Sequence, residues 1–211
     1  MTKDIMIVGA GGFGREAAWT LERINAAGGD PAWNVIGFDD DAPHLAEGTL
    51  EGYPLLGAVE KASRDNPGAA VFIAVGDNAV REDVSRRLRG HDFPAIVDPS
   101  ADVAPTVELG RGSFVGPQAV VSAGAEIGGF AIVNARAGVG HDSKIGDFAQ
   151  ICPGATLSGN TSVGAYALVA SNACTVPGVS IGERAKIAAG MPVYRDVSAD
   201  ATLSPFGTFR G

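Results

Sequence analysis

The feature that most constrains the fold of this chain is an aliphatic residue at every sixth position from Val97 to Val193. Sixteen of these seventeen positions hold Val, Ile or Leu, and the exception is Thr175. The residue four places later is usually Ala or Ser. Neither the period of a helix nor that of a strand produces a repeat of six. The spacing instead fits one flat side of a triangular coil, so that three units close a turn of eighteen residues.

Residues eighteen apart should then stack about 4.8 Å from one another, the spacing of neighbouring strands. Two of the ladders predicted in this way are Ile127, Ile145, Val163 and Ile181, and Val115, Val133, Ile151, Val169 and Ile187. We therefore expect residues 95–211 to form an all-β parallel β-helix with a continuous aliphatic core. A β-sandwich would need turns of variable length, which the unbroken register does not provide.

Residues 1–94 have a different pattern, in which short apolar runs alternate with helical segments. The run 5–8 leads into a glycine-rich turn and a helical stretch that ends near Ile24. Further apolar runs occur at 35–38 and 71–75, and a charged helical segment occupies 80–88. This alternation predicts a small α/β, Rossmann-like domain with a parallel sheet.

The glycine-rich turn at 9–14 has the strand, turn and helix context of a phosphate site. About ninety-five residues suffice for one mononucleotide half of a dinucleotide fold but not for both halves. A nucleotide-sugar is therefore favoured over NAD, with its diphosphate at the glycines and its base or ribose near the acids after 35–38. Alternatively, the glycines serve only turn geometry and helix packing. The candidate substrate contacts in this domain are Gly11, Gly12, Phe13, Arg15, Asp39 and Asp40.

Bulk properties narrow the classes of partner and the compartment. The formal charge of −8 argues against a nucleic-acid or anionic-membrane surface, both of which require a basic face. No run of eighteen apolar residues and no secretory signal are present, so we expect no membrane insertion. Two cysteines, Cys152 and Cys174, are too few for a disulfide framework, and we expect both to be reduced and buried in a cytoplasmic protein.

His141 is the candidate catalytic residue of the repeat region. It stands two places after an aliphatic position, where its side chain should project outward, and imidazole is suited to proton removal near neutral pH. Gly159 lies eighteen residues later, so its N–H could donate to the oxyanion of a tetrahedral intermediate. Asp142 could fix the imidazole tautomer if the chain bends at that point, and Asn134 on the preceding side could orient a substrate. Alternatively, the histidine is structural.

Several segments resemble bacterial nucleotide-sugar acetyltransferases, the group that includes bacillosamine-pathway N-acetyltransferases and sialic acid O-acetyltransferases. These segments are residues 7–12, 37–40, 74–78, 97–101, 139–142 and 145–148. The resemblance implies a left-handed β-helix that forms a homotrimer, with acetyl-CoA in the groove between subunits and a nucleotide-linked sugar on the α/β domain. It also implies His141 as general base, Asp142 as its orienting acid, Asn134 as a polar contact and Gly159 as the thioester N–H donor.

The chain departs from the resemblance at three places. Phe13 stands where similar proteins commonly carry histidine, and Gln150 stands where they carry a second histidine nine residues after the base. Both changes concern the sugar contacts, and Gln150 is kept as a candidate substrate contact. The segment 204–208 replaces a closing Gly-Asn-Pro-Ala, which concerns the adenine end of the coenzyme.

The sequence thus predicts a cytoplasmic, acetyl-CoA-dependent N-acetyltransferase that acts on a nucleotide-linked amino sugar by direct transfer, without a metal. Cations near the C-terminal coils could bind the coenzyme phosphates, although solvated surface positions would look the same. These cations are Arg184, Lys186 and Arg195. The alternatives are an O-acetyltransferase of sialic acid or another sugar, a non-catalytic nucleotide-sugar-binding protein and, more remotely, an NAD-dependent oxidoreductase.

Overall fold

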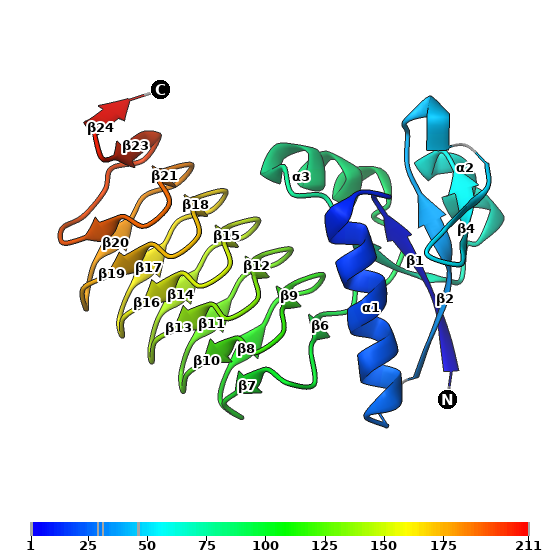
Figure 1. Cartoon of the computed structure of the whole chain (residues 1–211), viewed down its shortest axis with the longest axis horizontal. Helices are drawn as coiled ribbons and strands as arrows, with labels where there is room; N and C mark the ends of the chain where they lie inside the picture. Colours follow the sequence, from blue (N-terminus) through cyan, green and yellow to red (C-terminus); the bar gives the residue numbers. More distant parts are fainter. Residues whose placement is uncertain (1, 29, 31, 46, 211) are drawn as a thin grey trace. The chain divides into compact units, whose positions relative to one another are not determined.

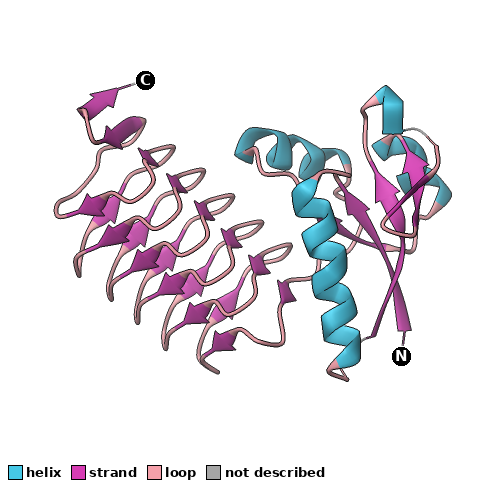
Figure 2. Cartoon of the chain, viewed as in Figure 1, coloured by secondary structure: helices cyan, strands magenta, loops and turns pink. Residues whose placement is uncertain are grey.

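The computed structural model describes residues 2–28, 30, 32–45 and 47–210. It divides into two compact units, Met1–Pro99 and Ser100–Gly211, which we call the α/β unit and the coil unit. Helices belong to the first unit, and the second consists of strands and turns (Figure 2). The predicted fold class, an α/β domain followed by a parallel β-helix, is confirmed.

The α/β unit alternates strands and helices along the chain. Its elements are β1 (Thr2–Val8), α1 (Gly12–Ala26), β2 (Ala32–Asp39), the 3-10 helix η1 (Pro43–Leu45), β3 (Thr49–Leu50), β4 (Tyr53–Gly57), α2 (Val59–Asp65), β5 (Ala70–Ile73), α3 (Asn78–Arg87) and β6 (Ile96–Val97). The sheet order is β3-β4-β2-β1-β5, and β1 pairs in parallel with both β2 and β5. The chain returns from β4 to the far side of β1, so the strand order reverses between β1 and β5. Ligands of open α/β sheets bind outside the carboxyl ends of the strands at such a switch point.

The coil unit is built mainly from two-residue strands that recur every six residues (Figure 1). They are β7 (Asp102–Val103), β8 (Glu108–Leu109), β9 (Phe114–Val115), β10 (Val120–Val121), β11 (Glu126–Ile127), β12 (Ile132–Val133), β13 (Gly138–Val139), β14 (Lys144–Ile145), β15 (Gln150–Ile151), β16 (Thr156–Leu157), β17 (Ser162–Val163), β18 (Leu168–Val169), β19 (Cys174–Thr175), β20 (Ser180–Ile181), β21 (Lys186–Ile187) and β22 (Pro192–Val193). The longer β23 (Ala201–Ser204) and β24 (Gly207–Arg210) end the unit as an antiparallel pair.

Three parallel sheets form the sides of the coil. Sheet I contains β7, β10, β13, β16, β19 and β22, sheet II contains β8, β11, β14, β17 and β20, and sheet III runs from β9 through β12, β15, β18 and β21 to β23 and β24. The predicted eighteen-residue stacking is confirmed, since Ile127 pairs with Ile145 and Val133 with Ile151. From Val115 to Val193 the repeat positions are buried, as are the Ala and Ser residues four places later, which gives the continuous core that the repeat predicted. Val97, Val103 and Leu109 are half-buried.

The coil turns through left-handed backbone conformations at its corners. Ten non-glycine residues of the coil unit have φ between +55° and +59°, one at the third place after an aliphatic residue in most turns. Asn and Asp tolerate this conformation, whereas bulky side chains rarely adopt it. It nevertheless holds three aromatic residues at the corner between sheets II and III, Phe130, Phe148 and Tyr166.

These three aromatic rings stack face to face along the corner. The ring centroids of Phe130 and Phe148 are 5.1 Å apart, and those of Phe148 and Tyr166 are 5.4 Å apart, with interplanar angles of 7° and 4°. The Arg111 guanidinium lies 5.4 Å from the Phe130 ring centre. Stacking and burial of the rings offset the cost of their strained backbone.

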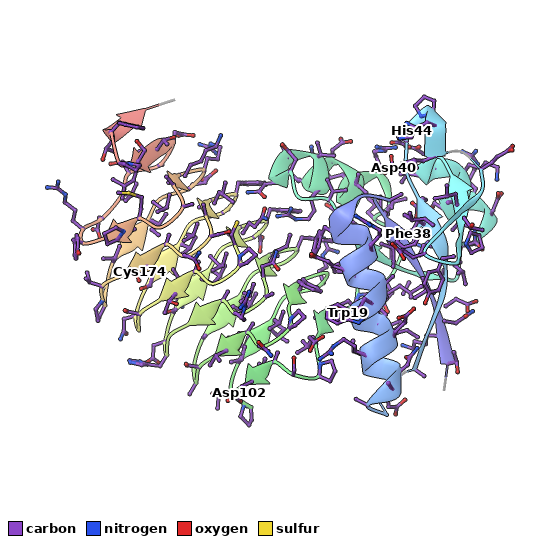
Figure 3. All side chains as sticks on the ribbon, viewed as in Figure 1. Trp19, Phe38, Asp40, His44, Asp102 and Cys174 are labelled. Carbon is purple, nitrogen blue, oxygen red and sulfur yellow. The ribbon has the colours of Figure 1, made fainter. Side chains whose placement is uncertain are left out.

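Both cysteines are free thiols, but their burial differs from the expectation. Cys152 is half-buried, and Cys174 is exposed on the outward side of β19 (Figure 3), so the prediction that both are buried was wrong. The reason is the alternation of a strand, which turns Cys174 outward when its neighbour Thr175 turns inward. Of the helices that the structure describes, none is both long and apolar enough to cross a membrane.

Candidate active site

His141 and Asp142 form a hydrogen-bonded pair at the corner between sheets I and II. The imidazole Nδ1 lies 2.8 Å from Asp142 Oδ2, and both side chains are 63% exposed. Successive residues of a straight strand point apart, but Asp142 has a φ of +57°, which turns its carboxylate back toward the ring. The bend that this pairing required is therefore present. Nδ1 can donate its proton to the carboxylate, which leaves Nε2 as the acceptor.

Gly159 lies directly against the imidazole, one coil further along the same corner. A β-carbon built on Gly159 would be 2.4 Å from His141 Nε2 and 2.6 Å from Cε1, closer than any real β-carbon approaches another atom. Position 159 must therefore be glycine for the ring to occupy this place. Across residues 2–28, 30, 32–45 and 47–210, the structure contains no acceptor for the Gly159 N–H. The base and a free backbone donor thus come from adjacent coils.

Asn134 and Gln150 lie on other parts of the coil. Asn134 follows β12 at the corner between sheets III and I, and its Oδ1 accepts a hydrogen bond from the Ala135 N–H at 2.6 Å. Gln150 is in β15 of sheet III, whereas His141 follows β13 of sheet I. The structure does not bring either side chain to the His141 corner of the same chain.

The three candidate coenzyme cations occupy three different positions. Arg195 is exposed at the same corner as His141, three coils further on, which corresponds to about 14 Å at the ordinary strand spacing. Arg184 lies at the corner between sheets II and III, and its Nε lies 2.6 Å from Asp200 Oδ1. This bond to Asp200 raises the pKa of the guanidinium. Lys186 is exposed on β21 of sheet III. Of the three, Arg195 alone shares the corner of the base.

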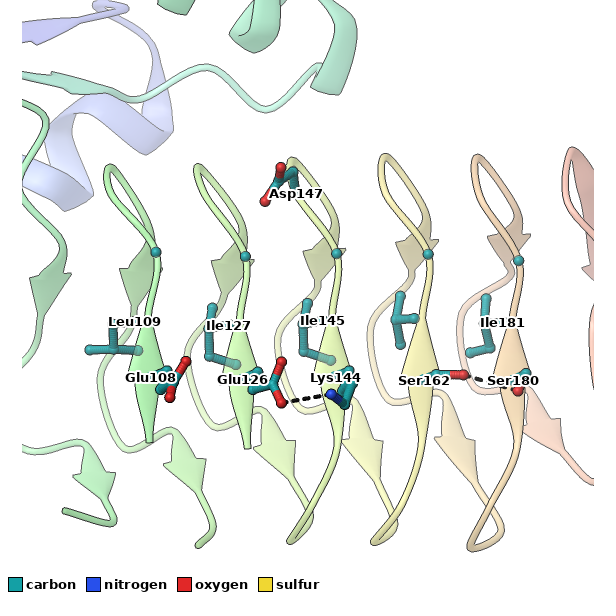
Figure 4. A pocket seen from close by; sticks show the side chains of 16 residues that line it. Glu108, Leu109, Glu126, Ile127, Lys144, Ile145, Asp147, Ser162, Ser180 and Ile181 are labelled. Atoms are coloured by element: carbon teal, nitrogen blue, oxygen red, sulfur yellow. Dashed lines mark hydrogen bonds and ion pairs between the residues drawn. The ribbon is translucent and has the colours of Figure 1, made fainter. Parts of the chain in front are cut away.

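A groove of about 680 Å³ follows sheet II and is lined by its strands and by the glycines that lead toward the corner with sheet III (Figure 4). Its outward side chains are charged on three coils and small on the next two, namely Glu108, Glu126, Lys144, Ser162 and Ser180, and two pairs bridge neighbouring coils. Lys144 lies 2.7 Å from Glu126, and Ser162 donates to Ser180 at 2.9 Å. The groove runs along the coil axis and is open to solvent.

The glycine turn of the α/β unit lies at the switch point of its sheet. Gly14 is required because a β-carbon there would lie 2.0 Å from the Gly9 carbonyl oxygen, whereas Gly11 and Gly12 are exposed with open space around them. Asp40 accepts a hydrogen bond from the Ala10 N–H at 2.9 Å. The start of α1 therefore presents an open backbone surface edged by a carboxylate that is held in place.

Phe13 packs inward from this open surface, whereas Arg15 lines a pocket that also includes Gly12. Phe13 packs edge-on against Phe72, with ring centroids 5.9 Å apart. Arg15 contacts Glu51 at 3.4 Å and lines a pocket of about 450 Å³ beside α1, which also includes Trp19 (Figure 3). Sequence reasoning missed this pocket, and a half-exposed tryptophan in a charged helix was the signal that could have found it.

Asp39 is fully buried, although the sequence placed it near a base or ribose. Neither carboxylate oxygen has a hydrogen-bond partner in the described part of the chain. Burial raises the pKa of Asp39 to about 8, and the nearby charges of Asp41 and Asp40 add to the rise. The side chain lies beneath the surface of the α/β unit, where it does not line an open site.

No cluster of three or more His, Cys, Asp or Glu side chains that could hold a metal ion occurs within the described residues. The Nδ1 of His141 is engaged by Asp142, which is the arrangement of an oriented base. An exposed imidazole with a carboxylate partner and an adjacent backbone donor can remove a proton and stabilise an oxyanion at one place.

Known proteins resemble the chain in both units. Residues 4–88 match the family described as the PglD N-terminal domain. The UDP-N-acetylbacillosamine N-acetyltransferase of Bacillus subtilis strain 168 is 35% identical over 116 residues, which are 54% of this chain and 51% of that protein. The chain therefore matches about half the length of this relative.

Two solved structures align with nearly the whole chain. The acetyltransferase domain of PglB from Neisseria gonorrhoeae FA1090, in complex with acetyl coenzyme A, has a TM-score of 0.89 and 29% identity, with 100% of each chain covered. PerB from Caulobacter crescentus, in complex with CoA and GDP-perosamine, has a TM-score of 0.86 and 30% identity over 98% of this chain and 96% of PerB. The similarity thus extends across the α/β unit and the coil unit.

Proposed function

This chain belongs to the bacterial nucleotide-sugar N-acetyltransferase family, and on that premise we propose that it transfers the acetyl group of acetyl-CoA to the amine of a nucleotide-linked amino sugar. The observation that carries the proposal is the His141 corner, where an exposed, carboxylate-bound imidazole lies against the backbone of Gly159. This arrangement suits direct acyl transfer, in which one group removes a proton and another stabilises a developing negative charge.

His141 acts as the general base. Its Nδ1 proton is bound by Asp142, so Nε2 accepts the proton of the sugar amine as the nitrogen attacks the thioester carbonyl. The new C–N bond forms, the C–S bond breaks when the tetrahedral intermediate collapses, and the CoA thiolate leaves and takes up the proton. Asp142 keeps the ring in the required tautomer and orientation throughout.

The Gly159 N–H donates to the thioester oxygen. Charge accumulates on that oxygen in the tetrahedral intermediate, and a backbone donor that is already in place stabilises it without reorganisation. Glycine also leaves room for the imidazole, since any side chain would overlap the ring. Glycine at position 159 therefore both supplies the oxyanion donor and leaves space for the base.

The coenzyme lies along the coil axis from the His141 corner toward Arg195. The guanidinium of Arg195, about 14 Å away along the same corner, contacts coenzyme phosphates at a separation that an extended pantetheine arm can cover. Arg184 and Lys186 face other sides of the coil, from which they reach the coenzyme of a neighbouring subunit and not that of their own His141 corner.

The active assembly is a homotrimer. Asn134 and Gln150 lie away from the His141 corner of their own chain, so they reach the reacting groups only from a neighbouring copy. A closed ring of three copies supplies such a neighbour at every site.

The α/β unit binds the nucleotide diphosphate. Gly11 and Gly12 at the start of α1 offer unhindered backbone N–H groups and the positive end of the helix dipole. Asp40, which is held by the Ala10 N–H, edges this surface and accepts hydrogen bonds from a base or ribose. Phe13 supports the turn by packing on Phe72, and Arg15 lies beside it at the rim.

Radiolabelled acetyl-CoA, offered together with UDP-, GDP- and dTDP-linked amino sugars, tests the proposal. We expect label in a product that resists mild base, because amides persist where esters hydrolyse. His141→Ala should lower kcat by about 10²–10⁴-fold with the fold retained. An unchanged kcat in His141→Ala would remove the imidazole from the mechanism, and a base-labile product would assign the chain to O-acetylation instead.

A further inference from the structure

A network of buried hydroxyl groups lies directly behind the His141 corner. Thr175, the exception in the aliphatic repeat, is 6% exposed, and Thr161 and Ser143 are 1% and 0% exposed. Thr175 Oγ1 lies 3.1 Å from Thr161 Oγ1 and 3.0 Å from the Ser158 N–H that it accepts. Thr161 Oγ1 donates to the Ser158 carbonyl at 2.7 Å, and Ser143 Oγ donates to the same carbonyl at 3.2 Å.

The direction of each hydrogen bond follows from the single proton of each hydroxyl. Thr161 uses its proton on the Ser158 carbonyl, so Thr175 must donate to Thr161. The bonds then run from the Ser158 N–H through Thr175 and Thr161 back to the Ser158 carbonyl, which closes a ring. Ser143 joins it by accepting from the Thr161 N–H at 3.1 Å. Hydrogen bonds linked in this way strengthen one another in a low-dielectric interior.

The network replaces the regular backbone bonds of the coil at this one turn. One coil earlier at the same corner, the Gly140 N–H donates to the Leu157 carbonyl at 2.8 Å, whereas the Ser158 N–H donates to the Thr175 side chain. The pairing of β16 with β19 accordingly retains Thr156 with Cys174 but not the next pair. At regular turns the carbonyl in this place accepts from the backbone N–H three residues on, as Gly146 does from Ala149 at 3.2 Å. At Ser158 the hydroxyls of Thr161 and Ser143 instead hold that carbonyl of the following peptide.

That peptide is the one that carries the Gly159 N–H. In a trans peptide the carbonyl oxygen and the amide hydrogen point in opposite directions. Because the Ser158 oxygen points inward to the hydroxyls of Thr161 and Ser143, the Gly159 N–H points outward, toward the side on which the His141 ring lies.

We infer that Ser143, Thr161 and Thr175 are positioning residues that aim and polarise the Gly159 N–H as the oxyanion donor. This inference rests on the proposed function. Two hydroxyl hydrogen bonds to the Ser158 oxygen draw electron density through the amide, which makes its N–H a stronger donor. Valine at 175 would satisfy the repeat, and the Ser158 N–H could then return to the backbone carbonyl of residue 175, which also accepts from the Ser158 hydroxyl at 2.6 Å. Threonine at this position therefore replaces a regular backbone hydrogen bond with side-chain bonds that hold one peptide.

Three variants separate this role from a structural one. Thr175→Val removes the hydroxyl while keeping the shape, Thr175→Ser keeps the hydroxyl, and Ser113→Ala removes a fully buried hydroxyl that has no hydrogen-bond partner in the described chain. We expect Thr175→Val to lower kcat roughly tenfold, a fraction of the loss from deleting an oxyanion donor. KM for the nucleotide sugar and the shape of the pH–rate profile should be unchanged, because the interaction belongs to the transition state.

Thr175→Ser should restore most of the rate, Ser113→Ala should match wild type, and Thr175→Val should melt at or above the wild-type temperature. The inference is overturned if Thr175→Val keeps the wild-type kcat, if Thr175→Ser is as slow as Thr175→Val, or if the loss of rate follows a loss of folded protein. A His141→Ala variant assayed in parallel distinguishes the two failures. If it is inactive while Thr175→Val is normal, the positioning role alone fails, and if it is fully active, the proposed function fails and the inference with it.

Discussion

The buried carboxyl group of Asp39 makes the stability of the α/β unit depend on pH. Burial without a hydrogen-bond partner disfavours the charged form and raises the pKa of Asp39 from 3.8 to about 8. Between these two values the folded chain keeps a proton that the unfolded chain releases. The contribution of Asp39 to the free energy of unfolding is therefore greatest below pH 3.8. It is lost progressively as the pH rises toward 8.

The difference of about four pKa units sets the size of the effect. Each unit corresponds to about 1.36 kcal/mol, so the full loss between the two pKa values is about 6 kcal/mol. Asp39→Asn keeps the shape of the protonated side chain and does not ionise. We expect the variant to match wild type near pH 4 and to exceed its free energy of unfolding by several kcal/mol above pH 8.

Urea unfolding followed by the helical circular dichroism band measures this difference, because the described helices α1, α2 and α3 all lie in the α/β unit. Both proteins are compared at several pH values from 4 to 9, with Glu16→Gln as a control that neutralises an exposed carboxylate of α1. The reasoning is refuted if the curves of wild type and Asp39→Asn stay parallel over the whole pH range, since the carboxylate would then be as well solvated folded as unfolded.

Three further substitutions test the packing around the site and the core. Gly159→Ala places a methyl group 2.4 Å from His141 Nε2, so the imidazole must move and acetyl transfer should fall at least roughly hundredfold in a steady-state assay. Arg23→Met removes the 2.8 Å partner of the buried Asp98 carboxylate, and urea unfolding should show a loss of stability relative to wild type. Phe148→Ala removes the middle ring of the aromatic stack and should cost about 3–5 kcal/mol in the same measurement.

Each of these has a matched control. Gly138→Ala adds a methyl group 3.5 Å from Thr156, an ordinary contact, and should leave activity unchanged. Adding Asp98→Asn to Arg23→Met should recover much of the lost stability, because no buried charge remains. A wild-type rate in Gly159→Ala would contradict the first argument. The second would fail if the double variant recovered no stability, and the third if Phe148→Ala unfolded like wild type.

The six-residue period made most of the coil unit predictable. It identified which aliphatic residues stack, and it placed Gly159 on the coil next to His141 because eighteen residues return the chain to the same corner. The period fails near the end of the unit, where Ile187 pairs with Leu203, sixteen residues on, and Arg184 pairs with Asp200. A repeat of six could not predict that shortened coil.

The parts that sequence reasoning missed depend on local departures from regular structure. Asp39 follows a register shift after Phe38 in the pairing of β2 with β4, so alternation along the strand did not reveal its burial. Thr175 stood out as an exception to the repeat, but its role depends on a hydrogen-bond ring with Thr161 that only three-dimensional register reveals. The sequence could predict the pairing of His141 with Asp142 only if the backbone bends at Asp142, and its positive φ supplies that bend.

The eighteen-residue circuit also restricts how a gene of this kind can change its length. Six residues inserted between Asp142 and Ser158 would preserve the aliphatic pattern yet rotate everything downstream by one face, carrying Gly159 away from His141. Eighteen inserted residues would keep the face but separate the two by one additional strand spacing, about 4.8 Å. The stretch that joins the two partners therefore has a fixed length, whereas whole coils added after Gly159 would alter only the reach to Arg195.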